Sequence, residues 1–345
     1  MRRARGITTV AVLALLGFGR GASAQFYEQR NLVSDGSVPA DHANDSQLKN
    51  AWGLTASATS PWWIADNGTN LSTLYNGNTG EKQGLVVQVG GAPTGAVFNG
   101  TGGFLLNGSP ARFIFSAEDG RIRAWNGGAA ATVTQTVDGA IYKGLAIAST
   151  PAGPRLYATN FHAATVDVFD TGFNLVPGGF VDPNLPAGYA PFGIQTINDT
   201  VYVTYALQDE DKEDEIAGQG NGFVDAYDLS GNFVRRVASG GVLNAPWGVA
   251  LAPDDFGKYS NDLLIGNFGD GKIHAFSPDK LEGNGQYQLH GPLHSVDGAP
   301  LVIDGLWAIQ FGNGAAAGPR TTLFFTAGPD DEEGGLFGSL VVGHP

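Results

Sequence analysis

A phrase that recurs six times constrains this chain more than any other feature of its sequence. Each copy holds a small residue, Gly or once Ala, in a short apolar segment. An apolar strand and then a strand ending in an aromatic residue follow. Neighbouring copies lie 42, 49, 49, 55 and 60 residues apart, and they begin at Trp52, Thr94, Lys143, Phe192, Trp247 and Trp307. Repeats of roughly 40–50 residues built from short strands are typical of a β-propeller. The sequence therefore predicts an all-β, six-bladed propeller.

Each blade of such a fold is a four-stranded antiparallel sheet. In the first repeat we expect strands over residues 52–55, 62–66, 71–75 and 85–89. The sixth repeat lacks a fourth strand, whereas residues 29–34 precede the first repeat and have no blade of their own. Because an open ring would leave two unpaired sheet edges, we expect residues 29–34 to close the ring as the outer strand of the last blade.

The first 24 residues have the pattern of a signal peptide. A basic start is followed by an apolar stretch over residues 8–18 and by the small residues Ala22-Ser23-Ala24, which together favour export and cleavage. We therefore expect a signal peptide over residues 1–24 and a single propeller domain over residues 25–345. The expected location is secreted or periplasmic.

Charge and composition narrow the expected partners. Without residues 1–24 the chain would have 15 Lys and Arg against 33 Asp and Glu, a net charge of −18. Such a chain repels nucleic acid and anionic lipid. It has no later apolar run long enough to span a membrane, and no cysteine for thiol catalysis or a Cys–zinc site. We expect an acidic monomer that binds no nucleic acid.

The repeats resemble those of NHL-type propellers. The closest copies are Asn160-Phe161 with Val166-Asp167-Val168-Phe169-Asp170, and Asn267-Phe268-Gly269-Asp270-Gly271-Lys272-Ile273-His274-Ala275-Phe276. The start resembles an exported, uncharacterised propeller family that is often found in bacteria with exosortase-type sorting. The matching segments are Asn31-Leu32-Val33-Ser34-Asp35, Ala51-Trp52-Gly53-Leu54, Pro61-Trp62-Trp63-Ile64-Ala65-Asp66-Asn67-Gly68-Thr69 and Ser72-Thr73-Leu74-Tyr75-Asn76-Gly77. Many such relatives end in a Pro-Glu-Pro motif, a membrane span and a basic tail, which this chain does not have. The resemblance implies a fold and a soluble exported form, but no activity.

Polar residues follow the second strand of every repeat, where the turns of a propeller lie on one face around the pore. They are Asp66 and Asn67, Glu118 and Asp119, Asn160 and His162, Gln208 and Asp209, Asn267 and Asp270, and Asp330 and Asp331. Oxygen ligands of this kind suit Ca²⁺. The candidate metal ligands are Asp66, Glu118, Asn160 and Asn267, with His162 as a candidate base. The alternative is structural, because Asp and Asn after a strand often cap turns.

A resemblance to six-bladed propellers of the gluconolactonase and paraoxonase type implies one use for such a metal. There a pore metal would polarise a lactone or ester carbonyl and activate water. Those families place a Glu on the first inner strand, where this chain has Ala51-Trp52-Gly53-Leu54. This departure counts against transferring the activity.

Two acidic runs occupy matching positions in the fourth and sixth repeats, at residues 209–215 and 330–333. They would flank one face of the ring and give it a negative rim that collects cations or a basic ligand. Solvated, flexible loops are the alternative. Trp52, Trp247 and Trp307 recur at equivalent places, where they either stack on a ligand at the pore mouth or pack between blades. The predicted binding face thus comprises Asn67, Asp119, Asp209, Asp270, Asp330, Trp52, Trp247 and Trp307.

Three functions are compatible with these features, because one fold serves many activities. The first is an exported propeller that binds a small molecule, a glycan or a protein on its pore face. The second is a Ca²⁺-dependent hydrolase of lactones or esters. The third is a structural or adhesive extracellular protein. The sequence favours the first and does not name the ligand.

Overall fold

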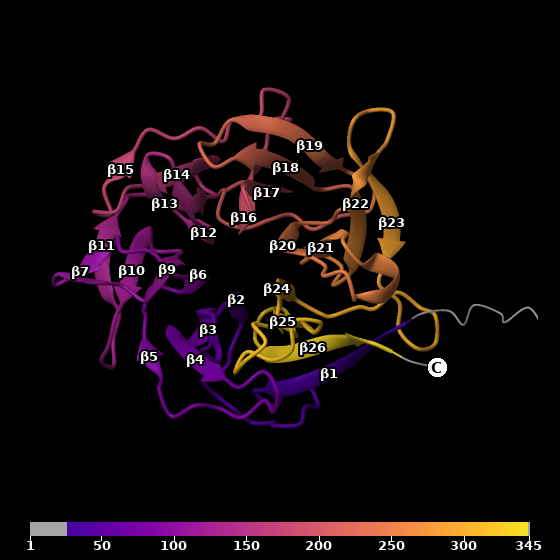
Figure 1. Cartoon of the computed structure of the whole chain (residues 1–345), viewed down its shortest axis with the longest axis horizontal. Helices are drawn as coiled ribbons and strands as arrows, with labels where there is room; N and C mark the ends of the chain where they lie inside the picture. The colour runs from indigo at the N-terminus through magenta and orange to yellow at the C-terminus, as the bar shows by residue number, and fades with distance from the viewer. Residues whose placement is uncertain (1–25, 344–345) are drawn as a thin grey trace, which may run out of the picture.

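A computed structural model describes residues 26–343 of the chain. They form six four-stranded antiparallel sheets, set around a ring like the blades of a propeller, and one small two-stranded sheet (Figure 1). The predicted six-bladed propeller is therefore confirmed. The predicted signal peptide, residues 1–24, lies outside the described residues.

The strands of each blade run from the axis outwards. The innermost strands are β2 (Ala51–Thr55), β6 (Pro93–Phe98), β12 (Tyr142–Thr150), β16 (Tyr189–Ile197), β20 (Pro246–Leu251) and β24 (Leu306–Phe311). The second strands are β3 (Trp62–Asp66), β9 (Phe113–Ala117), β13 (Gly153–Asn160), β17 (Thr200–Leu207), β21 (Leu263–Asn267) and β25 (Leu323–Ala327).

The third strands are β4 (Leu71–Tyr75), β10 (Arg121–Trp125), β14 (Thr165–Phe169), β18 (Phe223–Asp228), β22 (Ile273–Leu281) and β26 (Leu336–Val342). The outer strands are β5 (Val87–Gln88), β11 (Thr132–Thr136), β15 (Leu175–Val176), β19 (Phe233–Ser239), β23 (Tyr287–Pro292) and β1 (Tyr27–Ser34). The remaining elements are the two-stranded sheet of β7 (Leu105–Leu106) and β8 (Ser109–Pro110), and the 3₁₀ turns η1 (Asn67–Thr69) and η2 (Gly257–Tyr259).

The two ends of the described chain meet in the sixth blade. Strand β1 pairs antiparallel with β26, from Tyr27 opposite Val342 to Ser34 opposite Leu336, so the predicted closure of the ring is confirmed (Figure 1). The outer strand of the first blade is shorter than predicted, with only Val87–Gln88 in β5. It ends there because the amides of Val89 and Gly90 turn to the carbonyl of Asn70.

The recurring glycine marks the place where neighbouring innermost strands touch. A Cβ atom on Gly193 would lie 2.0 Å from the carbonyl oxygen of Trp247 in the next blade, and one on Gly53 would lie 2.5 Å from that of Thr94. Real Cβ atoms do not approach backbone so closely, so only glycine fits at these positions. The repeat seen in the sequence is therefore a packing requirement of the ring.

Buried hydroxyl groups join adjacent blades beside these glycines. The Thr159 hydroxyl accepts a hydrogen bond from the Gly144 amide and donates one to the carbonyl of Phe192 in the next blade, each 2.7 Å long. The Thr326 hydroxyl makes the same link from the sixth blade to the Trp52 carbonyl of the first. Each link satisfies backbone groups that have no strand partner. No helix between residues 26 and 343 has the length and apolar character needed to cross a membrane.

Candidate functional site

One end of the propeller axis is closed by large side chains. They come from the first residue of every repeat but the second, which has Thr94 there; this position precedes the recurring small residue. Trp52 and Trp307 stack with their ring centroids 3.5 Å apart, and Trp247 meets both edge-on at 6.2 and 6.0 Å. The three side chains are 2%, 0% and 9% exposed. These predicted binding-face residues therefore pack against one another across the axis and are not presented to solvent.

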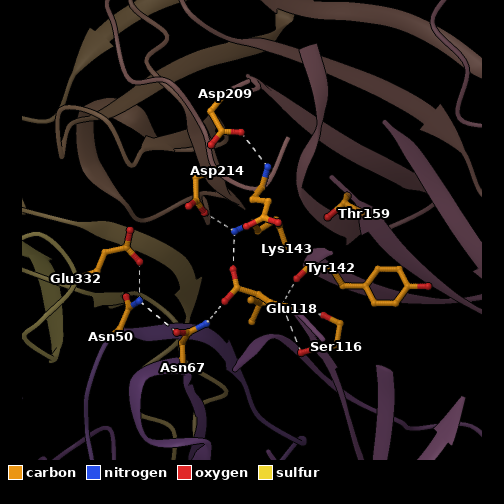
Figure 2. A network of polar contacts seen from close by, with 12 residues as sticks. Asn50, Asn67, Ser116, Glu118, Tyr142, Lys143, Thr159, Asp209, Asp214 and Glu332 are labelled. Carbon is orange, nitrogen blue, oxygen red and sulfur yellow. Dashed lines mark hydrogen bonds and ion pairs between the residues drawn. The ribbon is translucent and has the colours of Figure 1, made fainter. Parts of the chain in front are cut away.

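Lys143 occupies the equivalent position in the third blade, and its side chain is only 1% exposed. Its Nζ lies 2.5 Å from Glu118 Oε1 and 3.0 Å from Asp214 Oδ1 (Figure 2). The same atom lies 5.2 Å from the centroid of the Trp52 ring. The Trp52 indole Nε1 is buried without a hydrogen-bond partner in the described part of the chain. Lys143 is thus a buried ammonium held by two carboxylates beside an aromatic ring, an arrangement that favours a cation.

Two further polar side chains extend this network towards the sixth blade. Asn67 donates a hydrogen bond to Glu118 Oε2 at 3.0 Å, and Asn50 donates one to Glu332 Oε2 at 2.6 Å (Figure 2). The Asn50 oxygen accepts a hydrogen bond from the Trp307 indole. The carboxylates therefore reach the axis from separate blades. Asp214 belongs to the acidic loop between β17 and β18, and Glu332 to the acidic loop between β25 and β26.

We call this end of the axis the acidic mouth, defined by Glu118, Asp214, Glu215 and Glu332 around Lys143. Burial lowers the pKa of Lys143, but the charges of Glu118 and Asp214 outweigh burial and raise it above its ordinary value. Lys143 is therefore protonated at neutral pH and is not a nucleophile. Four carboxyl groups share this single buried ammonium.

Two of the carboxyl groups have raised pKa values because they are buried. Burial raises the pKa of Glu215 to about 8, although the charge of Lys143 opposes the rise. Burial also raises the pKa of Glu332, against a hydrogen bond from Asn50 and the charge of Lys143. A cation bound beside these groups would lower both pKa values. The acidic mouth can therefore bind positive charge and exchange protons as it does so.

The backbone of the second acidic loop is strained. Asp330, Asp331 and Glu332 have φ values of 61°, 50° and 68°, and three consecutive non-glycine residues in the left-handed region are uncommon. Such strain persists only where the surroundings hold it, and it clusters at functional sites. Here the strained residues form the turn that places the Glu332 carboxylate beside the Asn50 side chain.

The four predicted metal ligands have separate surroundings. Asp66 is fully buried and accepts a hydrogen bond from the Thr73 amide, and burial raises its pKa well above the usual range. Glu118 binds Lys143, as described above. Asn160 donates a hydrogen bond to Asp167, and Asn267 donates to Asp270, each within its own blade. Between residues 26 and 343, no three His, Asp or Glu side chains form a group that could hold a metal ion.

The other predicted face residues also have local partners. Asp119 accepts hydrogen bonds from Arg121 and Arg123. Burial would raise its pKa, but these hydrogen bonds hold it below its usual value. Asp209 caps its loop by accepting from the Glu213 amide, and Asp270 pairs with Lys272 at 3.0 Å. The remaining predicted residues are Asn67, which binds Glu118, and the exposed residues His162 and Asp330.

Sequence reasoning missed Lys143 and Asn50 as site residues. Lys143 had a visible signal, because four of the six equivalent positions carry aromatic residues and one carries a lysine. Asn50 had no such signal: its role depends on Glu332, which is 282 residues away in the chain.

Comparisons with known proteins give relatives for nearly the whole chain. No protein-family profile matches it. Uncharacterized protein R648 of Acanthamoeba polyphaga mimivirus is 33% identical over 350 residues, which cover 94% of this chain and 82% of the viral protein. Uncharacterized protein L690 of the same virus is 31% identical over 351 residues, which cover 94% of this chain and 88% of the viral protein.

Solved structures share the fold at low identity. A PQQ-bound aldose sugar dehydrogenase from Streptomyces coelicolor matches with a TM-score of 0.55 and 14% identity, over 92% of this chain and 98% of that chain. Virginiamycin B lyase from Staphylococcus aureus matches with a TM-score of 0.52 and 14% identity, over 92% of this chain and 99% of that chain. These likenesses establish the propeller architecture and no activity. By its identity to the two viral proteins, the chain belongs to the family of mimivirus proteins R648 and L690.

Proposed function

We propose that this propeller binds a partner protein through a cationic segment of that partner, which docks on the acidic mouth. One observation carries the proposal: acidic loops from the fourth and sixth blades converge with Glu118 on a single buried lysine at the axis. Carboxylates that are not fully compensated attract lysine and arginine side chains and steer them towards the site.

The exposed part of the two loops supports a partner larger than a single ion. Residues 210, 211, 213 and 214 of the first loop and 330, 331 and 333 of the second are acidic and exposed. The side chain of Asp214 is 74% exposed even though it contacts Lys143. A segment with several basic residues would meet carboxylates at the axis and along both loops at once. We also propose that the protein acts after export, which the pattern of residues 1–24 supports.

A binding measurement with a basic peptide tests this function. We expect hexalysine to bind the purified chain at low salt, and binding to weaken as salt is added, because exposed charges are screened. The double variant Asp214→Asn with Glu332→Gln should bind about tenfold more weakly, since removing close charge partners costs roughly 1–2 kcal/mol. Fluorescence anisotropy with a labelled peptide measures both effects.

The matched control removes the same charge elsewhere. Asp254 and Asp255 are exposed in the loop between β20 and β21, at the opposite end of the blades. Asp254→Asn with Asp255→Asn should leave peptide affinity nearly unchanged. An equal loss of peptide affinity in both double variants would mean that only the net charge of the protein matters, and would contradict the proposal. Stoichiometric Ca²⁺ binding at the mouth without peptide binding would contradict it too and favour the hydrolase hypothesis.

Peptide affinity should also depend on pH in a defined direction. Cation binding favours the ionised carboxylate, and the pKa of Glu215 is raised to about 8. Affinity should therefore rise between pH 6 and pH 9, as Glu215 loses its proton. The variant Glu215→Gln should flatten this rise. A pH-independent affinity in the unmodified protein would show that Glu215 does not take part.

A further inference from the structure

The opposite end of the axis has a cavity whose lining includes no charged side chain. This cavity of about 180 Å³, which we call the funnel, lies at the carboxyl ends of the innermost strands β2, β6, β12, β16 and β24. It shares Leu54, Ala96, Gln195 and Gln310 with a narrower axial channel of about 30 Å³. That channel also contacts Trp247, one of the indoles that close the acidic mouth. The funnel and the channel therefore adjoin each other along the axis.

Polar groups on the funnel wall can donate and accept hydrogen bonds without carrying charge. Gln195 and Gln310 supply two side-chain amides, each with donors and an acceptor. Thr55 is 6% exposed, and its hydroxyl accepts a hydrogen bond from the Phe98 amide, which leaves the hydroxyl proton free to donate. The buried hydroxyl oxygen of Thr196 has no partner within residues 26–343.

The rest of the wall is apolar, with Val97, Phe98 and Ile147 among its residues. A charged ligand would lose its hydration here without meeting an opposite charge, which is costly. The volume is below the roughly 300 Å³ at which pockets for drug-sized ligands begin. A small neutral molecule with both hydroxyl groups and an apolar face matches this lining. Sugars have this character, because their ring C–H groups form apolar patches between the hydroxyls.

We propose that the funnel is a second binding site, which takes one neutral sugar ring, either as a free monosaccharide or as the terminal residue of a glycan. Gln195 and Gln310 would hydrogen-bond the hydroxyl groups, and Phe98 would contact an apolar face of the ring. This site lies at the end of the axis opposite the acidic mouth and does not depend on the function proposed there.

Ligand-observed NMR and calorimetry on the purified chain test the proposal, with glucose, galactose, N-acetylglucosamine and maltotriose as neutral probes and glucuronate as a charged one. At least one neutral sugar should bind saturably, and glucuronate should not. Monosaccharide binding would indicate a free-sugar site, whereas binding of maltotriose alone would indicate a glycan end. Gln195→Leu and Gln310→Leu should each weaken binding about tenfold, the effect of losing one hydrogen bond.

Two controls separate this site from the acidic mouth and from misfolding. Asp214→Asn with Glu332→Gln should retain sugar affinity, while the glutamine variants should retain hexalysine affinity and the melting temperature. Ala56→Trp, which fills the funnel from its rim, should abolish sugar binding without altering either amide. The proposal is overturned if no neutral sugar binds saturably at concentrations up to about 100 mM, roughly a hundredfold above a Kd of 1 mM. It is equally overturned if glucuronate binds as well as the neutral sugars, or if the funnel variants bind normally.

Discussion

Gly193→Ala should destabilise the propeller by about 3 kcal/mol, the upper end of the usual cost of overpacking a well-packed core. The new Cβ atom would lie 2.0 Å from the carbonyl oxygen of Trp247 and 2.8 Å from its carbonyl carbon. Both atoms are backbone, so no side chain can rotate away. The fourth and fifth blades would have to separate at the axis to relieve the contact. Chemical denaturation followed by tryptophan fluorescence measures the loss.

Gly283→Ala is the matched control for this prediction. Gly283 lies in the turn between β22 and β23, where an added Cβ would meet no atom within 4 Å. This variant should match the unmodified chain within about 0.5 kcal/mol, as surface substitutions usually do. If Gly193→Ala were as stable as Gly283→Ala, close contact between innermost strands would not explain the repeated glycine.

Lys143→Met should destabilise the chain by about 2 kcal/mol, between the effect of breaking a buried ion pair and that of breaking an exposed one. Methionine keeps most of the side-chain volume but leaves Glu118 and Asp214 without their shared cation. Glu118 is 29% exposed and Asp214 74% exposed, so water would offset part of the loss. The melting temperature measured by circular dichroism should fall by about 4 °C.

Lys212→Met provides the comparison, since Lys212 is an exposed lysine in the acidic loop that carries Asp214. Its replacement removes the same charge and should change the melting temperature by less than about 1 °C. Equal shifts in the two variants would mean that Lys143 acts only through net charge. A stable Lys143→Met variant would mean that the carboxylates do not depend on the buried ammonium.

The architecture was predictable because its signals are local and repeated. A small residue recurs every 42 to 60 residues, glycine in five blades and Ala308 in the sixth. It reflects one contact made at each junction between blades, so six similar junctions leave six similar marks in the sequence. Pairing of β1 with β26 was predictable for a different reason. The last repeat lacks an outer strand, and an extra strand precedes the first repeat. Pairing the extra strand with the last repeat is the one arrangement that leaves neither of them with an unpaired edge.

The site was less predictable, because its contacts cross between blades. Lys143 meets Glu118 at a separation of 25 residues and Asp214 at 71, and no local pattern encodes these distances. The acidic loops were visible in the sequence, and their matching positions gave the correct expectation that they flank one face.

The polar turn residues were visible in the sequence, but their pattern is compatible with two different roles. Asn160 and Asn267 follow their strands as metal ligands in a pore would, but each donates its side-chain amide to an aspartate a few residues ahead. Turn capping and metal ligation use the same residue types at the same place. Which contact forms depends on the neighbouring aspartate, whose position the repeat pattern does not specify.

The proton balance of peptide binding should be measured first. The acidic mouth is proposed to bind cationic groups through carboxyl groups that include Glu215, whose pKa burial raises to about 8, so binding should displace protons from Glu215. Calorimetric titration of hexalysine into the protein at pH 7.5, in two buffers of different ionisation enthalpy, should give different heats that correspond to net proton release. The release should fall in Glu215→Gln and persist in Asp254→Asn with Asp255→Asn. No binding at low salt would contradict a cation-binding function for the acidic mouth, whereas identical heats in the two buffers would show that Glu215 does not take part in it.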